Sequence, residues 1–148
     1  MKFLLTIIFL SLSKLVFAGC ISGDCSNGYG THLFEDGQNK GDKYIGEFKN
    51  YEFSGLGTYY FTNGDIYSGQ FKNGAPNGIA SFNYAVGAKY IGEFKNGLFH
   101  GLGTYTYNGT KYVGEFKNGL YNGQGTYTHA DGSTERGIFK DNNIVTRN

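Results

Sequence analysis

Residues 90–107 read YIGEFKNGLFHGLGTYTY, and parts of this stretch recur along the chain. YIGEFKN also stands at 44–50, and YVGEFKN stands at 112–118. The glycine of this phrase and its counterparts lie 23, 23, 22 and 23 residues apart, at Gly46, Gly69, Gly92, Gly114 and Gly137. A phrase repeated at near-constant spacing indicates a repeat architecture, because a catalytic motif is normally needed once.

Each repeat predicts two short antiparallel strands. Tyr, Phe, Thr and Ile favour a pleated surface, and stretches such as 43–49 and 103–107 alternate with period two. Asn-Gly and Asp-Gly pairs favour type I′ turns, because both central residues need positive φ. Such pairs stand at 36–37, 63–64, 73–74, 96–97, 108–109, 118–119 and 131–132.

The alternation also assigns two faces to the predicted sheet. Tyr44, Gly46 and Phe48 point one way, whereas Ile45, Glu47 and Lys49 point the other. The glycines leave room for a neighbouring ring to lie over the backbone. A lone hairpin is marginal, so the units are expected to fold as a stack. The fold class predicted is all-β, an elongated single-layer antiparallel β-meander or solenoid of about five 23-residue hairpin repeats.

The phrases YIGEFKNGLFHGLGTY at 90–105 and YVGEFKNGLYNGQGTY at 112–127 resemble MORN (membrane occupation and recognition nexus) repeats. The resemblance covers residues 23–140. It implies a scaffold or interaction module. Some members of the family are credited with binding acidic phospholipids, and others with dimerisation or protein docking. We expect a repeat domain at 41–140, between an N-terminal capping half-repeat at 20–40 and a C-terminal tail at 141–148. Its units are expected near 44–66, 67–89, 90–111 and 112–134, with a partial unit at 135–140.

The first 19 residues have the features of a signal peptide. Lys2 precedes an apolar run over 3–13 that is too short to span a bilayer. Cleavage before Gly19 and cleavage before Cys20 are both consistent with the sequence. The second resembles processing at a bacterial lipobox and would make Cys20 a lipidation site. We therefore expect a bacterial-type exported protein, periplasmic, extracellular or lipid-anchored to the cell envelope.

The chemical state of the two cysteines depends on which cleavage site is used. Cleavage before Gly19 permits a Cys20–Cys25 disulfide, because exported proteins meet oxidising conditions. Lipidation of Cys20 would instead leave Cys25 as a single thiol. No metal site is predicted, because zinc needs about four ligands and no histidine lies at matching spacing. No cofactor is expected.

Charge and motifs weigh against two functional classes. Lys and Arg number 13 against 12 Asp and Glu, without the basic excess of a nucleic-acid-binding protein. The histidines, His32, His100 and His129, lack the nucleophile and carboxylate of a catalytic triad, and no G-x-S-x-G motif is present. We therefore predict a non-enzymatic protein without catalytic residues.

Two sets of residues are candidates for an interaction surface. One lysine recurs in each unit, at Lys49, Lys72, Lys95, Lys117 and Lys140. Such a row suits anionic headgroups, although nearby glutamates could neutralise it. Three aromatic residues, Phe53, Phe99 and Tyr121, are expected in the connection between the two strands, where rings are freer to bind.

These sets support three functional hypotheses. The leading one is a scaffold that binds a protein at the cell envelope. The alternative is peripheral binding of acidic phospholipids through the lysine row, and a weaker alternative is binding of cell-wall glycans through exposed aromatic rings. In all three, a homodimer through a sheet edge is conceivable.

Overall fold

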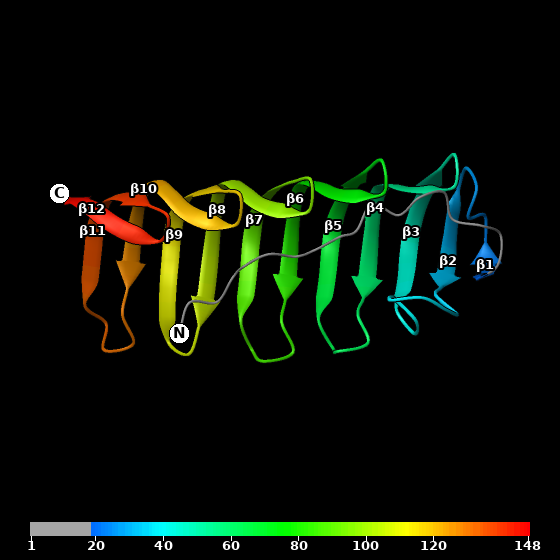
Figure 1. The fold of residues 1–148 in the computed structure, drawn as a ribbon, viewed down its shortest axis with the longest axis horizontal. Coiled ribbons are helices and arrows are strands. Elements are labelled where there is room, and N and C mark those ends of the chain that lie inside the picture. Colours follow the sequence, from blue (N-terminus) through cyan, green and yellow to red (C-terminus); the bar gives the residue numbers. More distant parts are fainter. Residues whose placement is uncertain (1–18) are drawn as a thin grey trace.

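The computed structural model describes residues 19–148, which form one open sheet of 12 antiparallel strands in chain order (Figure 1). The predicted all-β repeat fold is confirmed. The strands are β1 (Cys20–Gly23), β2 (Tyr29–Leu33), β3 (Lys43–Lys49), β4 (Glu52–Tyr60), β5 (Ile66–Lys72), β6 (Ala75–Asn83), β7 (Lys89–Lys95), β8 (Leu98–Tyr107), β9 (Thr110–Lys117), β10 (Leu120–Thr128), β11 (Thr134–Lys140) and β12 (Asn143–Arg147). Residues 1–18, on which the signal-peptide prediction rests, lie outside the described part. Over 19–148, no helix has the length and hydropathy to cross a membrane.

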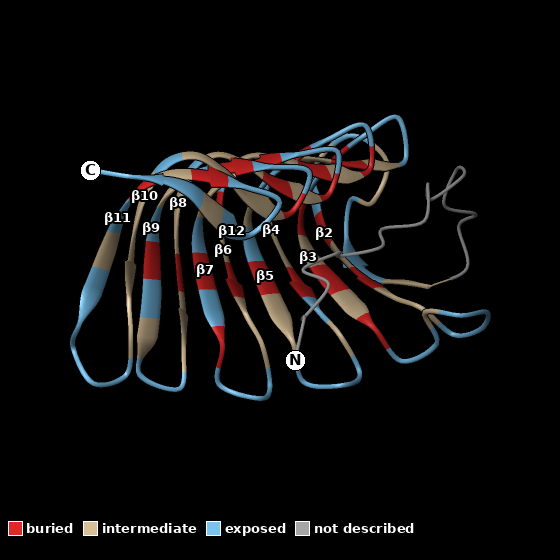
Figure 2. Ribbon diagram, turned by 60° about the vertical axis from the view of Figure 1, so that its left-hand side comes forward, coloured by how far each residue is buried: buried red, intermediate tan, exposed pale blue. Residues whose placement is uncertain are grey.

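Each hairpin bends at a corner, so that its upper end folds over one side of the sheet (Figures 1 and 2). In the β7–β8 hairpin, Gly92 faces Gly103, but the next pair is Glu93 with His100. Gly101 and Leu102 are therefore two extra residues on the returning strand, and such a bulge bends a strand. We call the folded-over ends, residues 47–54, 70–77, 93–100, 115–122 and 138–145, the hairpin tips.

The inner side of this bent sheet holds the core. Fully buried rings include Tyr44, Tyr67, Tyr90 and Tyr112, one from each successive unit. The ring of Tyr90 stacks on Phe99 with centroids 3.7 Å apart and lies edge-on to Phe116 of the next hairpin at 4.9 Å. The predicted face is confirmed, because Tyr44, Gly46 and Phe48 are buried while Glu47 and Lys49 are exposed.

The predicted loop position of Phe53, Phe99 and Tyr121 is wrong. These residues lie within β4, β8 and β10. Phe53 and Phe99 are 0% exposed, and Tyr121 packs against the core. The physical reason is the two-residue turn before each of them, which fixes the register so that Phe99 stands opposite Phe94 on the inner face.

The turns fall into two kinds. At 73–74, 96–97, 108–109 and 118–119 both residues have positive φ, which confirms the type I′ prediction. At 36–37, 63–64 and 131–132 only the glycine has positive φ, so that prediction is wrong there. At 61–65, the backbone N–H of Phe61 donates to the carbonyl oxygen of Asp65 at 3.0 Å. The N–H of Gly64 donates to the carbonyl oxygen of Phe61, also at 3.0 Å. This closes a three-residue loop, a type I turn followed by a left-handed glycine.

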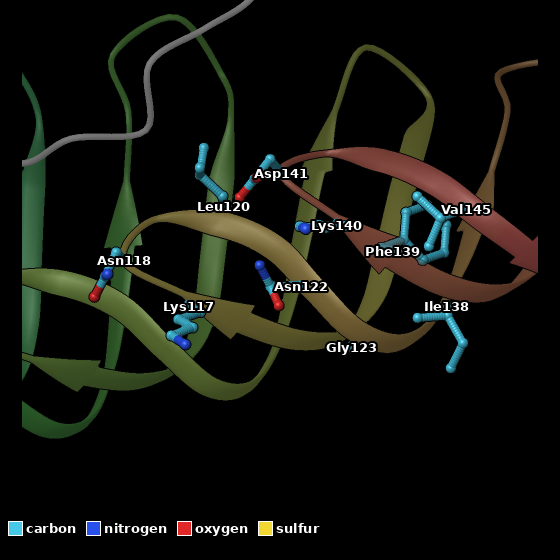
Figure 3. A pocket seen from close by; sticks show the side chains of 10 residues that line it. All are labelled: Lys117, Asn118, Leu120, Asn122, Gly123, Ile138, Phe139, Lys140, Asp141 and Val145. Carbon is cyan, nitrogen blue, oxygen red and sulfur yellow. The ribbon is translucent and has the colours of Figure 1, made fainter.

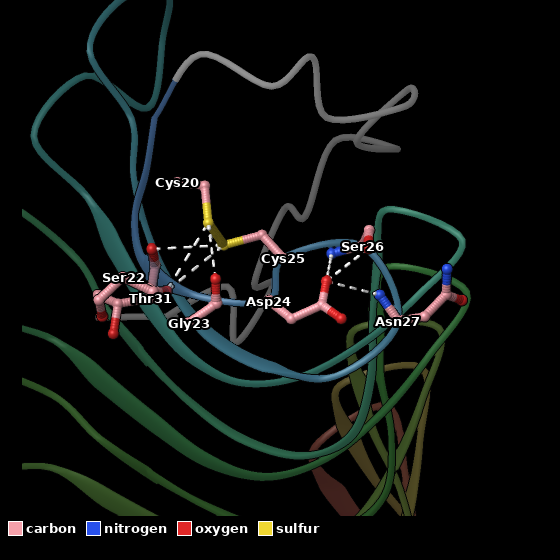
Figure 4. The surroundings of a disulfide bond; sticks show 8 residues. All are labelled: Cys20, Ser22, Gly23, Asp24, Cys25, Ser26, Asn27 and Thr31. Carbon is pink, nitrogen blue, oxygen red and sulfur yellow. Dashed lines mark hydrogen bonds between the residues drawn. A yellow bond between two sulfur atoms is a disulfide. The ribbon is translucent and has the colours of Figure 1, made fainter.

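The two ends of the sheet complete hairpins of their own. Residues 141–148, predicted as a tail, include β12, which pairs with β11. Asp141 and Asn142 have φ of 49° and 68°, so they form the same turn as Asn-Gly without a glycine to signal it. At the other end, a Cys20–Cys25 disulfide joins β1 to the following turn (Figure 4).

Candidate binding surface

In the four hairpins from β3–β4 to β9–β10, the corner is held by a tyrosine and a glutamate or glutamine of the same strand. The hydroxyl of Tyr90 donates to the backbone oxygen of Glu93 at 2.9 Å. The carboxylate of Glu93 accepts the backbone N–H of Leu102 at 2.8 Å, a group that the bulge leaves without a strand partner. The same 2.8 Å contact joins Glu47 to Leu56, Gln70 to Ile79 and Glu115 to Gln124. Since neutral Gln70 serves equally, the contact works as a hydrogen bond and does not need charge.

The tyrosine hydroxyls are permanent donors in this arrangement. Burial, followed by the nearby charge of Glu115, raises the pKa of Tyr112 to about 12. The pKa of Tyr90 is raised by the same two causes, burial and the charge of Glu93. Both hydroxyls therefore stay protonated at neutral pH, and the repeated Tyr-x-Gly-Glu-Phe sequence is explained by the corner it builds.

The five predicted lysines lie beside the turns of the hairpin tips, and all five are exposed. Adjacent tips are two strands apart, so successive lysines stand about 10 Å apart. Within residues 19–148, the only ion pairs are those of Glu135 with His129 and with Arg147. None of the five lysines is therefore paired with a carboxylate, although the corner glutamates lie on the same outer side.

A row of exposed aliphatic residues on the outer face was missed at the level of sequence. Leu56, Ile79 and Leu102, which we call the aliphatic ridge, are 61, 61 and 65% exposed. They occupy the same corner position of three units, 23 residues apart. Ile91 lies diagonally between Ile79 and Leu102 and is 49% exposed. The signal that could have revealed the ridge is an aliphatic residue that recurs at the repeat period directly after a glycine, at Gly55, Gly78 and Gly101.

A second set of lysines borders the ridge on its other side. This set stands on the outer face near the lower ends of the strands and consists of Lys43, Lys89 and Lys111. Lys43 lies opposite Tyr60, and Lys89 and Lys111 lie on either side of Thr106. The ammonium group of Lys43 lies 4.8 Å from the centre of the Tyr60 ring. The aliphatic ridge thus lies between two basic rows.

The MORN repeat family model matches residues 44–66, 67–89, 90–109 and 112–134, which is more than half of the chain. The chain belongs to the MORN repeat family. A search of curated proteins finds no match. MORN repeats are generally modules that bind proteins or membranes rather than enzymes, which fits a non-enzymatic binding scaffold.

The histidines are dispersed among the MORN units and their flanks. His32 on β2 is 4% exposed and lies edge-on to Phe34 at 4.7 Å, and burial lowers its pKa. His100 faces Glu93 across the β7–β8 pair, and His129 follows β10, 3.8 Å from Glu135. Over residues 19–148, no group of three or more His, Cys, Asp or Glu side chains is placed to hold a metal ion.

The edges of the MORN sheet are β1 and β12. A strand at an edge offers unpaired backbone groups to another chain. Pairing with a second copy at either edge stays a prediction.

Proposed function

We propose that this protein is an exported, non-catalytic MORN scaffold that binds a protein partner at a bacterial-type cell envelope through its aliphatic ridge. The observation that carries the proposal is the exposure of Leu56, Ile79 and Leu102 at the repeat period. Scattered apolar residues on a surface are normal, whereas an aligned apolar set bordered by polar residues is typical of an interaction site.

Export is supported by the Cys20–Cys25 disulfide, because such bonds persist in oxidising compartments. The disulfide and lipidation of Cys20 exclude each other, since both would use the same sulfur atom. The bond therefore favours cleavage before Gly19 and a protein that is free of a lipid anchor. Intact mass of the protein from its native host tests this choice directly.

The test of the ridge is site-specific photo-cross-linking in the native host. With a benzophenone amino acid at Leu102, we expect one discrete adduct of higher mass after irradiation. The matched control is Val86, which is 67% exposed but lies in a turn away from the ridge. The proposal fails if Leu102 gives no adduct, or if Val86 gives the same products.

A second candidate function is peripheral binding of acidic phospholipids through the five tip lysines. It is favoured because none of these lysines forms an ion pair with another residue of 19–148. A lysine near an anionic membrane contributes about 1 kcal/mol. Replacing Lys72, Lys95 and Lys117 with Gln should therefore weaken co-sedimentation with phosphatidylglycerol vesicles on the order of a hundredfold at low salt.

The control for this experiment is the other basic row, Lys43, Lys89 and Lys111, changed to Gln with the same loss of charge. An equal loss of binding in both triple variants would mean that net charge, and not the tip row, attracts the vesicles. The glycan hypothesis is less well supported, because Phe53 and Phe99 are buried and Tyr121 is partly buried against the core.

A further inference from the structure

An open groove of about 470 Å³ lies between the tips of the last two hairpins, β9–β10 and β11–β12 (Figure 3). The β9–β10 hairpin contributes Lys117, Leu120 and Asn122. The β11–β12 hairpin contributes Ile138, Lys140 and Val145, and the buried Phe139 also lines the groove. The groove therefore combines an apolar lining with two cationic groups.

Two substitutions in the repeat make this groove unlike the spaces between earlier hairpins. The corner position that holds Glu47, Gln70, Glu93 and Glu115 in the other units holds Ile138 here. The position of Ser54, Asn77, His100 and Asn122 holds Val145. Val145 is also the single extra residue at this corner. Ile138 pairs with Thr146 and Phe139 pairs with Ile144, so Val145 has no partner on β11. As a result its side chain is 58% exposed.

A space between the first two tips shows the contrast. It measures about 120 Å³ and is lined by Lys49, Asn50, Glu52, Phe53, Ser54 and Asn73. There Glu52 stands directly opposite Lys49 across the strand pair. In the terminal groove the residue opposite Lys117 is Leu120, and the residue opposite Lys140 is Asn143. The carboxylate that lines the terminal groove, Asp141, belongs to the turn and forms no ion pair with either lysine.

We propose that the terminal groove binds a peptide segment of a protein partner in which acidic residues flank an aliphatic one. The aliphatic side chain would pack against Leu120, Ile138 and Val145, and the carboxylates would meet Lys117 and Lys140. The two lysines belong to strands that are two spacings apart, about 10 Å. In an extended segment the side chains alternate between two faces, so an aliphatic residue and the acidic residues two positions before and after it point the same way. These acidic residues lie about 13 Å apart, at about 3.3 Å per residue, and the long lysine side chains can reach them.

The apolar lining of this groove favours a peptide over a membrane as its ligand. A lipid surface is met by the whole row of tip lysines, whereas the terminal groove is distinguished by its apolar lining between two of them. The side chain of Asn122 also lines the groove and can donate to a peptide carbonyl. The inference rests on the proposed role as a protein-binding scaffold, but it uses a surface separate from the aliphatic ridge.

The test is fluorescence anisotropy of the purified protein with a labelled peptide that carries Glu-Ala-Leu-Ala-Glu between alanines. We expect saturable binding that is lost when the peptide leucine becomes serine. The variant Ile138→Glu restores the residue of three other units, so it should fold, and it should raise the Kd roughly tenfold by adding a negative charge and removing apolar surface. Lys117→Gln with Lys140→Gln should have a similar effect.

The matched control is Lys49→Gln with Lys72→Gln, which removes the same charge from the other end of the row and should leave the Kd unchanged. Equal losses in the two double variants would overturn the proposal, as would binding that ignores the peptide leucine. Absence of peptide binding, with or without binding to phosphatidylglycerol vesicles, would overturn it as well. None of these three results would bear on cross-linking at Leu102, so failure of the groove and failure of the proposed function can be told apart.

Discussion

Replacing Phe99 with alanine is expected to lower the free energy of unfolding by about 4 kcal/mol, the range found for removing a buried aromatic ring. The ring is 0% exposed and stacks on Tyr90 at 3.7 Å. It also lies edge-on to Phe94 at 5.3 Å and to Phe116 of the next hairpin at 6.0 Å. Its removal therefore leaves a cavity within one unit and weakens the contact between two units. Urea unfolding followed by circular dichroism measures the change.

Leu102→Ala is the control for this experiment. Leu102 lies in the same unit and strand, but it is 65% exposed. Its removal should change stability by no more than about 0.5 kcal/mol. If the two variants shifted the urea midpoint equally, Phe99 would not be part of a packed core, and its earlier interpretation as a free binding residue would regain support.

The loss at Phe99 should also change how the protein unfolds. In a repeat array each unit contacts only its neighbours, so stability is a sum of units and interfaces. Weakening the interface at Phe116 should let the units before and after it unfold in separate steps. A second transition in the urea curve of Phe99→Ala would report this separation.

Much of the fold could be predicted from the sequence, because the repeat states each requirement several times. The glycine at 46, 69, 92, 114 and 137 gives the period, and the alternation around it gives the buried face. The corner could not be predicted in the same way. Gly101 and Leu102 interrupt the alternation by two residues, and in the sequence such an interruption is typical of a loop. The structure shows a bulge instead, in which the N–H of Leu102 donates to the carboxylate of Glu93.

The candidate site was harder to predict for the same reason. The sequence pattern alone places Phe99 in the connection between two strands, whereas the type I′ turn at Asn96-Gly97 sets a register in which Phe99 faces Phe94. The exposure of Leu102 depends on the corner itself, since the bulge carries this residue to the outer side. The lysines were easier, because polar residues beside a turn are exposed however the hairpin bends.

Replacing Gly92 with alanine is expected to lower the free energy of unfolding by about 3 kcal/mol, the upper end of the usual cost of overpacking. A Cβ at this position would lie 2.5 Å from the Tyr90 hydroxyl oxygen, 2.6 Å from the Gly103 Cα and 2.6 Å from the Leu102 carbonyl oxygen. Two of these atoms belong to the backbone of the paired strand and cannot turn away. The φ of Gly92 is not in the left-handed region, so close contact alone accounts for the expected cost.

Gly132→Ala separates the two reasons for a glycine. Gly132 has a φ of 85°, and nothing lies within 4 Å of an added Cβ, so its replacement tests backbone strain without crowding. The expected cost is about 1 kcal/mol. Thermal or urea unfolding of both variants gives the comparison. Equal costs would mean that the strands move apart to accept a methyl group at Gly92.

The chain contains a natural comparison that sharpens this expectation. Ala80 occupies the position of Gly103 in the second unit and faces Gly69. The position of Gly103 can therefore hold one methyl group. It does so in the unit where Pro76 takes the place of the stacked ring of Phe99. The position of Gly92 holds glycine in every unit. A large loss for Gly92→Ala would show that the tyrosine hydroxyl and the paired strand together fill this space, which links the repeated glycine to the corner that the same tyrosine holds.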